Sequence, residues 1–308
     1  MNTGTLSALS RQGSWAVLLA GGDGTRLQSL TRQIEGDSRP KQFCRIFGGK
    51  SLLGQTLERV DPLFRADRTM FVVTKAHEAF YRDDLRRTDD SRVLAQDQNR
   101  GTAVAIAAAL LRIVHRDADA IVAFFPCDHY YSDDDAFAST VRTALTAAGE
   151  YPASLILVGA EAHYPEVEYG WIEPGLELRG PPPAALSRVS RFWEKPSLPK
   201  ARELLRRGCL WNTFVTIGRA DAFLELLCAG IPDVVFRLAG AVTDSDLDGA
   251  YREVRAVDFS RDVLAPQPQR LLVLRDAASG WTDLGNPARV FNTLARNSIE
   301  PAWLNQVR

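Results

Sequence analysis

Glycines and a cation gather near the start of the chain in an order that suits a bound polyphosphate. Residues 21–27 read Gly-Gly-Asp-Gly-Thr-Arg-Leu and follow a short apolar run. Glycines in such a loop let backbone N–H groups approach phosphate oxygens, because no side chain intervenes. A glycine loop of this kind is equally typical of a plain turn at the end of a strand.

The residue sequence of this loop distinguishes it from two common phosphate-binding motifs. A P-loop carries Lys followed by Ser or Thr, whereas this loop carries Arg26. A dinucleotide fingerprint requires a third small residue where Leu27 stands, and no helical pattern follows at once. The loop therefore predicts a phosphate cradle of another class.

A second cation follows the glycine loop. Lys41 lies in the run Arg-Pro-Lys-Gln-Phe at 39–43, where Pro40 stiffens the backbone. A lone lysine in a loop is usually solvated. Arg26 and Lys41 near one cradle nevertheless suit a triphosphate, because charge moves onto the leaving pyrophosphate during transfer.

Two carboxylates are candidate metal ligands. Asp128 follows the apolar run 120–125, so it should lie at the carboxyl edge of the sheet, where open parallel sheets bind ligands. Asp283 lies in the glycine-bracketed segment 280–285. Carboxylates are natural ligands of Mg²⁺, and these two could meet on one ion. The alternative for Asp128 is an ordinary turn, with the acidic run 133–135 capping the next helix.

The elements that must position these groups alternate between strands and helices in the first half of the chain. Short apolar runs predict strands, and apolar residues at helical spacing predict helices. The predicted strands are 15–20, 69–74, 92–95, 120–125 and 154–159, and the predicted helices are 52–63, 76–87, 102–115 and 133–148. Because alternation favours right-handed crossovers, we expect an α/β fold with a mainly parallel sheet and helices on both faces.

The second half of the chain is less regular. Its predicted elements are a turn at 180–183, an extended segment at 187–194, a helix at 198–207, a strand at 210–218, helices up to 252, a strand at 270–275 and a helix at 287–295. No repeat or linker divides the sequence. We therefore expect a flexible tail at 1–14 and a single domain over 15–308.

Composition excludes several classes of protein. The 308 residues carry a formal net charge of -1, without the basic surplus typical of nucleic-acid binding. The four cysteines lie far apart, which argues against a disulfide framework or a zinc site. No apolar run is long enough for a signal sequence or a membrane span. These features predict a cytoplasmic protein without a nucleic-acid or membrane partner.

Seven short motifs in order resemble those of the sugar-phosphate nucleotidyltransferases, over about residues 15 to 295. They are Gly-Gly-x-Gly-Thr-Arg-Leu (21–27), Pro-Lys-Gln-Phe (40–43), Pro-x-Asp-His (126–129), Tyr-Gly-Trp-Ile (169–172), Phe-x-Glu-Lys-Pro (192–196), Trp-Asn-Thr (211–213) and Trp-Thr-Asp-Leu-Gly (281–285). Within that family the chain looks most similar to enzymes that guanylylate mannose 1-phosphate. The resemblance implies a Rossmann-like nucleotidyltransferase fold with a mixed sheet, divided into a nucleotide-binding half (about 15–150) and a sugar-phosphate-binding half (about 151–308).

The resemblance also implies roles for individual residues. The nucleotide would be bound by Gly21, Gly22, Gly24, Thr25, Arg26, Lys41, Gln96, Gly101 and Thr102, and the sugar phosphate by Gly170, Glu194, Lys195 and Asn212. Asp128 and Asp283 would hold Mg²⁺, and Arg26, Lys41 and Asp128 would be catalytic. A sugar-phosphate oxygen would attack the α-phosphorus of GTP in line, and pyrophosphate would leave.

Two departures from the family pattern leave alternatives open. Residues 96–103 read Gln-Asp-Gln-Asn-Arg-Gly-Thr-Ala, where many guanylyltransferases carry Glu-Asn-Thr-Ala-Pro. This segment would lie near the base, so the resemblance predicts the reaction and leaves the choice of base open. Residues 28–39 form a longer, more acidic loop, either a lid or a surface insertion. The alternative functions are transfer with another nucleotide, transfer to a heptose or glucose 1-phosphate, or an inactive nucleotide-sugar sensor. A homo-oligomer is also left open.

Overall fold

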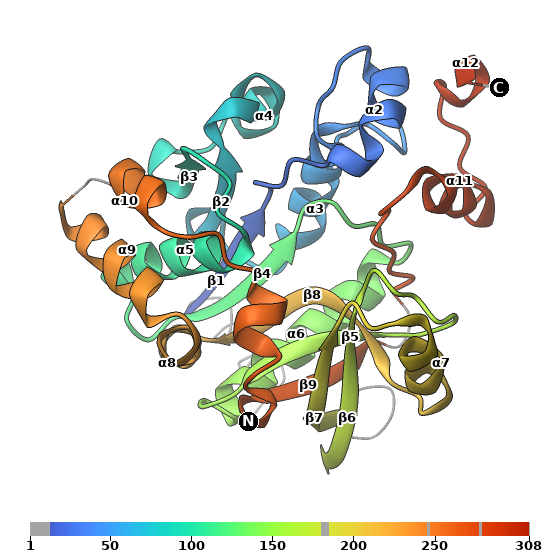
Figure 1. Ribbon diagram of the computed structural model, residues 1–308. Helices are drawn as coiled ribbons and strands as arrows, with labels where there is room; N and C mark the ends of the chain where they lie inside the picture. The colour runs from blue at the N-terminus through green and yellow to red at the C-terminus, as the bar shows by residue number, and fades with distance from the viewer. Residues whose placement is uncertain (1–12, 180–184, 245–246, 277–278, 308) are drawn as a thin grey trace.

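The computed structural model describes residues 13–179, 185–244, 247–276 and 279–307 (Figure 1). The turn predicted at 180–183 and residues 1–12 of the predicted tail lie outside the described residues. Within the described part, the first strand begins at Ser14, one residue earlier than predicted.

A single nine-stranded sheet, in the order β3-β2-β1-β4-β8-β5-β9-β7-β6, organises the molecule. The strands are β1 Ser14–Leu19, β2 Thr69–Thr74, β3 Val93–Gln96, β4 Ile121–Pro126, β5 Leu155–Glu161, β6 Gly170–Arg179, β7 Leu186–Glu194, β8 Leu210–Arg219 and β9 Leu271–Asp276. β7 and β8 run against the direction of the others. The mixed, mostly parallel α/β sheet that the sequence predicted is confirmed.

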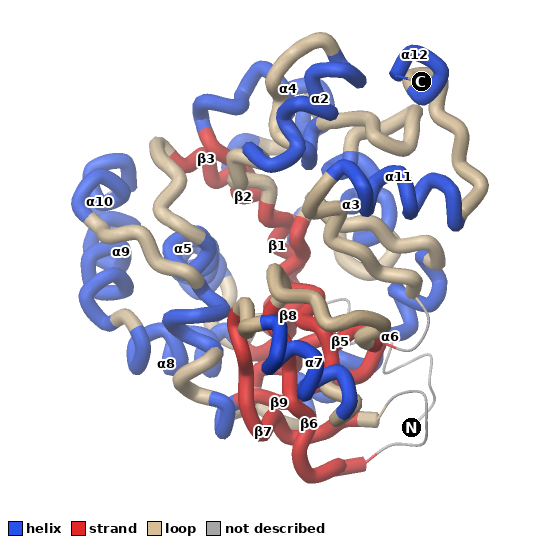
Figure 2. Tube along the Cα trace, turned by 45° about the vertical axis from the view of Figure 1, so that its right-hand side comes forward, coloured by secondary structure: helices blue, strands red, loops and turns tan. Residues whose placement is uncertain are grey.

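Helices cover both faces of this sheet. They are α2 Gln28–Glu35, α3 Leu52–Val60, α4 Glu78–Leu85, α5 Thr102–Arg116, α6 Asp134–Glu150, α7 Leu198–Arg206, α8 Ala220–Gly230, α9 Pro232–Asp244, α10 Leu247–Glu253, α11 Pro287–Arg296 and α12 Leu304–Val307. Helices α5, α8, α9 and α10 pack on one face, and α3 and α6 on the other (Figures 1 and 2).

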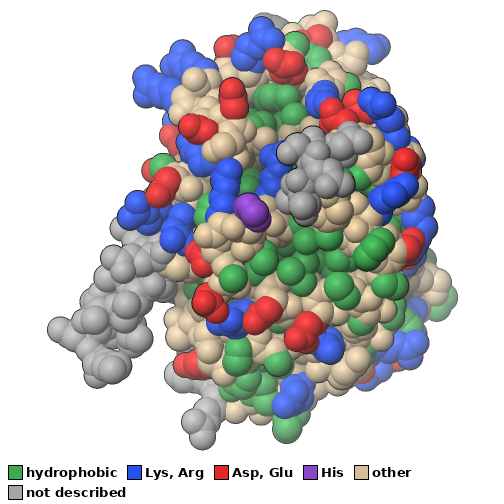
Figure 3. Space-filling view, turned by 90° about the vertical axis from the view of Figure 1, so that its left-hand side faces the viewer, with side chains coloured by type: hydrophobic (Ala, Val, Ile, Leu, Met, Phe, Trp, Pro, Cys, Tyr) green, Lys and Arg blue, Asp and Glu red, His purple; other side chains and the backbone are tan. Residues whose placement is uncertain are grey.

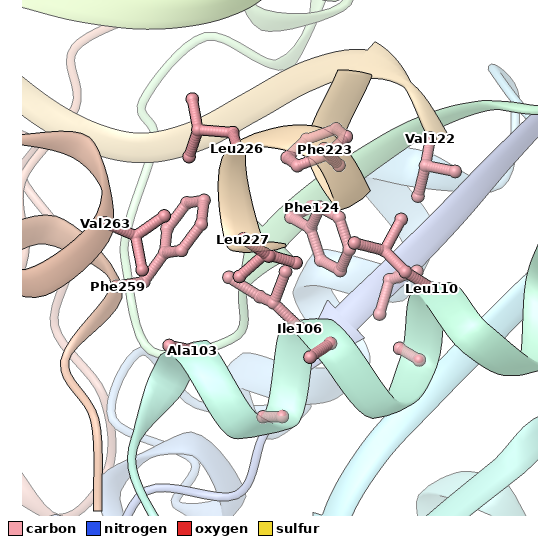
Figure 4. Close-up of a cluster of buried hydrophobic side chains, with 14 of the residues drawn as sticks. Ala103, Ile106, Leu110, Val122, Phe124, Phe223, Leu226, Leu227, Phe259 and Val263 are labelled. Atoms are coloured by element: carbon pink, nitrogen blue, oxygen red, sulfur yellow. The ribbon is translucent and has the colours of Figure 1, made fainter. Parts of the chain in front are cut away.

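The apolar run that predicted β1 is buried on both faces. Trp15 and Val17 join the core beneath α5, whereas Ala16 and Leu18 join the core beneath α3 and α6. Successive side chains of a strand point to opposite faces, so an unbroken apolar run fits a central strand. Figure 4 shows the first of these cores, where Ile106 of α5 lies close to residues of β4 and α8.

The segment 28–39 differs from its prediction. Gln28–Glu35 forms α2 directly after a short 3-10 helix at Thr25–Leu27, so a helix does follow the glycine loop at once. Leu27 and Leu30 are buried in a core shared with α3 and α11. Glu35 accepts hydrogen bonds from Arg45, which ties the end of α2 to the next segment. Glu35 thus holds the end of a packed helix in place and does not belong to a loop.

The surface charge and the state of the cysteines are those that the near-neutral net charge and the scattered cysteines of the sequence predict. On the face in Figure 3, basic and acidic side chains are interspersed around an apolar area. No helix within the described ranges is long and apolar enough to cross a membrane. The four cysteines are free, and all except Cys228 are buried.

Candidate active site

A cleft of about 520 Å³ opens at the carboxyl ends of β1, β3 and β4. It brings together segments that are far apart in the sequence, from the glycine loop to the segment after α10. The predicted site residues that line it are Gly21, Gly22, Arg26, Gln96, Gly101, Thr102, Asp128, Gly170, Glu194, Lys195, Asn212 and Asp283. Three further predicted residues, Gly24, Thr25 and Lys41, do not form part of this lining.

The glycine loop is held against the segment that carries Lys41. Gly24 has a φ of 60°, and a Cβ at this position would lie 2.9 Å from the backbone nitrogen of Lys41. A side chain here would therefore be strained and crowded at the same time. The Gln42 side chain donates to the carbonyl oxygens of Ala20 (3.0 Å) and Gly22 (2.6 Å). These contacts fix the shape of the loop before any phosphate arrives.

Lys41 is buried between the segments that carry Asp128 and Asp283. Its Nζ donates to the carbonyl oxygen of Asp283 at 2.6 Å and lies 3.2 Å from Oδ2 of Asp128. Only 8% of the Lys41 side chain is exposed. One ammonium thus joins the two segments that carry the candidate metal ligands.

A backbone pairing brings these two segments side by side. Tyr130 and Thr282 form an isolated antiparallel bridge, with reciprocal N–H to O=C hydrogen bonds of 2.9 Å. Asp128 and Asp283 lie two residues and one residue from this bridge. The two carboxylates that sequence reasoning paired therefore share one cleft.

Asp128 lies between an ammonium and an imidazole. Burial raises the pKa of Asp128, but the Lys41 ammonium, together with His129 and a backbone hydrogen bond, holds the pKa below its ordinary value. His129 has its pKa lowered chiefly by burial. Its Nδ1 accepts a hydrogen bond from Nε1 of Trp281 at 3.1 Å, so the ring is neutral with its proton on Nε2. Nε2 lies 3.6 Å from Oδ1 of Asp128.

Asp283 is surrounded by donors that sequence reasoning missed. Its Oδ1 accepts from the hydroxyl of Tyr169 (2.6 Å), Nη1 of Arg289 (2.6 Å) and the backbone of Gly285 (2.9 Å). Burial opposes ionisation, but Lys41 and Arg289 hold the pKa of Asp283 below its ordinary value. Tyr169 belongs to the motif at 169–172, but the sequence pattern assigned it no role. Arg289 belongs to no motif, so nothing in the sequence pointed to it.

Arg26 is also paired with a residue that the sequence did not single out. Its Nη1 lies 2.9 Å from Oε2 of Glu168, and both side chains are largely exposed. Glu168 lines the cleft beside Tyr169. An anion that enters the cleft must compete with this carboxylate for Arg26.

The residues assigned to the sugar phosphate lie together on β6, β7 and β8. Gly170 pairs with Glu194 across β6 and β7, and Lys195 Nζ lies 3.1 Å from Oε1 of Glu194. Burial raises the pKa of Glu194, although Lys195 opposes this. Oδ1 of Asn212 accepts from the backbone N–H of Phe214 at 3.1 Å. This bond orients the amide of Asn212, whose NH₂ group donates to no acceptor among the described residues.

At the other end of the cleft, β3 and the start of α5 present polar groups. Gln96 is 2% exposed, and its Oε1 has no hydrogen-bond partner within the described residues. Oγ1 of Thr102 accepts from the backbone N–H of Phe259 at 2.9 Å, which fixes the segment after α10. A buried acceptor without a partner is costly, so Gln96 is suited to a ligand that donates a hydrogen bond.

The carboxylates fit a divalent ion that arrives with a phosphate. The described residues contain no group of three or more His, Cys, Asp or Glu side chains that could form a metal site by themselves. Mg²⁺, however, is usually bound by one or two carboxylates together with water and substrate phosphates. Asp128 and Asp283 both favour the ionised form and supply the hard oxygens that such an ion requires.

Comparison with known proteins shows the family of the chain. The model of the nucleotidyl transferase family matches residues 15–296. The alginate biosynthesis protein AlgA of Pseudomonas aeruginosa is 28% identical over 291 residues, covering 92% of this chain and 59% of that protein. The mannose-1-phosphate guanylyltransferase of Klebsiella pneumoniae is 27% identical over 279 residues, covering 88% and 58%. The chain thus spans less than two thirds of the length of these curated relatives.

A solved structure extends the comparison. The crystal structure of mannose-1-phosphate geranyltransferase from Thermus thermophilus matches with a TM-score of 0.78 at 30% identity. The match covers 91% of this chain and 79% of that chain. The segments that form the cleft, and the sheet except for its first residue Ser14, fall inside the matched family region.

Proposed function

Because the chain belongs to the nucleotidyl transferase family, we propose that it transfers a guanylyl group from GTP to mannose 1-phosphate. The products are GDP-mannose and pyrophosphate. The observation that carries the proposal is the position of Lys41, whose ammonium contacts both Asp128 and the Asp283 backbone beside a glycine loop. The named activity of the Klebsiella pneumoniae relative supports the choice of substrates.

The reaction requires positioning and charge neutralisation rather than a covalent enzyme intermediate. A phosphate oxygen of mannose 1-phosphate bonds to the α-phosphorus of GTP while the bond from that phosphorus to the β-phosphate bridging oxygen breaks. The nucleophile is already an anion, so no general base is needed. Arg26 and Lys41 neutralise charge as it moves onto pyrophosphate, and Lys195 pairs with the sugar phosphate.

The metal in this proposal is Mg²⁺, held by Asp128 and Asp283. When bound, the ion would neutralise part of the charge of the triphosphate and orient the triphosphate and the sugar phosphate toward each other. Lys41 keeps the carboxylate of Asp128 ionised before the ion arrives. The substrates, rather than the protein alone, complete the coordination of the ion.

The polar groups at each end of the cleft support the choice of substrates. Glu194 accepts hydrogen bonds from sugar hydroxyls, while the oriented amide of Asn212 donates to the sugar. Gln96 presents an acceptor at the nucleotide end, and guanine carries N–H donors on its Watson–Crick edge. This acceptor calls for an N–H donor on the base, which guanine supplies through N1–H or its amino group.

Pyrophosphate release tests the proposal. GTP, ATP, UTP, CTP and dTTP are each crossed with mannose, glucose and heptose 1-phosphates in the presence of Mg²⁺. We expect release with GTP and mannose 1-phosphate, and its loss in Asp128→Asn. Pyrophosphate release with a different pair would support the same reaction with other substrates. No pyrophosphate release with any pair would contradict transfer to these sugars.

A further inference from the structure

One oxygen of the Asp283 carboxylate is saturated, whereas the other is not. Oδ1 accepts three hydrogen bonds, from Tyr169, Arg289 and the backbone of Gly285, at 2.6 to 2.9 Å. Oδ2 accepts no hydrogen bond from the part of the chain that the structure describes. A carboxylate oxygen has two lone-pair directions, so the crowded Oδ1 has no capacity left for a further ligand.

The donors on Oδ1 are themselves fixed. Arg289 lies on α11, where its Nη2 pairs with Oε2 of Glu166 and its guanidinium lies 4.6 Å from the ring centroid of Tyr169. The side chains of Arg289 and Glu166 are only 12% and 10% exposed. Oε1 of Glu166 accepts from the backbone N–H of Glu168 at 2.8 Å, and its carbonyl accepts from Trp171. The arrangement is therefore rigid and almost closed to solvent.

We propose that Tyr169 and Arg289 are positioning residues, which orient Asp283 so that Oδ2 alone is presented to a divalent cation in the cleft. This inference rests on the proposed function only in that a metal–phosphate complex enters the cleft. Mg²⁺ requires near-ideal octahedral geometry, and a carboxylate restricted to one free oxygen binds such an ion through that oxygen. Hydrogen-bond partners of a ligand set its orientation and alter metal affinity about 10- to 100-fold.

Tyr169 and Arg289 contribute differently. Arg289 neutralises two carboxylates, those of Asp283 and Glu166, so its removal leaves buried charge without a partner. The hydroxyl of Tyr169 is neutral, and Tyr169→Phe keeps the ring that packs against Trp211 and Trp281. Tyr169→Phe therefore isolates orientation from folding. Arg289→Lys tests whether a positive charge suffices without the planar guanidinium, which contacts Asp283 through Nη1 and Glu166 through Nη2.

The test measures binding of Mn²⁺ with inorganic tripolyphosphate to the full-length chain, by water proton relaxation. This readout requires neither turnover nor a particular base. We expect Tyr169→Phe and Arg289→Gln to weaken binding about tenfold or more, with partial recovery in Arg289→Lys. Tyr151→Phe and Arg296→Gln serve as matched controls, because neither residue is among the donors to the Asp283 carboxylate. Both controls should bind as the wild type does.

An Asp283→Asn background shows whether the effect passes through Asp283. In that background Tyr169→Phe should cause no further loss of Mn²⁺ binding. An equal loss in both backgrounds, or wild-type affinity in Tyr169→Phe, would overturn the inference, as would a wild-type chain that does not bind the complex. Wild-type binding that depends on Asp283 without pyrophosphate release from any substrate pair would sustain the inference while contradicting the proposed function.

Discussion

The ammonium of Lys41 lies 3.2 Å from Oδ2 of Asp128, and the two residues reach this contact from segments that are far apart in the sequence. Lys41 follows the glycine loop, whereas Asp128 follows the central strand β4. The contact keeps a carboxylate ionised and a cation in place.

Lys41→Ala should reduce kcat by about 10² to 10³, since it removes one preorganised charge from beside the leaving group. Steady-state measurement of pyrophosphate release checks this. Lys50→Ala is the matched control, because the Lys50 side chain is 57% exposed and lies outside the cleft. Near-normal turnover in Lys41→Ala would remove Lys41 from the mechanism.

Glu168→Gln should lower the KM for the triphosphate about two- to fivefold, because Arg26 would no longer be paired with a carboxylate 2.9 Å away. The effect is modest, since an exposed ion pair contributes at most about 1 kcal/mol. Arg26→Ala should raise the same KM. If Glu168→Gln also raised it, Glu168 would contribute to binding rather than compete with the substrate.

Gly101→Ala should destabilise the protein by about 1–3 kcal/mol and raise the KM for the nucleotide. Gly101 has a φ of 84°, and an added Cβ would collide with the carbonyl of Val257, whose backbone is hydrogen-bonded to Arg100 and Ala103. Gly149→Ala is the control, since nothing lies within 4 Å of a Cβ at that helical position. Urea unfolding of both variants checks the prediction, and equal stabilities would contradict it.

Glu35→Gln should lower the free energy of unfolding by about 1–3 kcal/mol at pH 7. Burial opposes ionisation of Glu35, but Arg45 and Arg39 hold its folded-state pKa below the ordinary value of 4.5. A depressed folded-state pKa stabilises the protein above pH 4.5, and this contribution is lost as the pH falls through the folded-state value. The difference between wild type and variant should therefore shrink below pH 4.5. A difference that stayed constant down to pH 3 would contradict this origin.

The sequence predicted every strand except β6, Gly170–Arg179, which no predicted element covered. It also predicted the cleft residues that lie in short, compositionally distinctive segments. An apolar run before Gly21 and another before Asp128 were enough to place both residues at one edge of the sheet. Helix α2 was missed, although Leu27, Leu30 and Ile34 carry helical spacing, because its polar residues resembled a loop.

Contacts between distant, ordinary-looking charged residues could not be predicted. Arg289 and Glu166 are 123 positions apart, and neither stands in a recognisable motif. Their pairing depends on how α11 packs beside the loop before β6, which no local pattern encodes. The same holds for Arg26 and Glu168, whose contact spans 142 positions.

Product analysis of a reaction of GTP, mannose 1-phosphate and Mg²⁺ tests the central claim most directly. Followed by ³¹P NMR, the wild-type chain should convert the two substrates into GDP-mannose and pyrophosphate in equal amounts, and Asp128→Asn should not. Unchanged substrate resonances with a folded wild-type chain, or phosphate release without a nucleotide sugar, would contradict guanylyl transfer to mannose 1-phosphate.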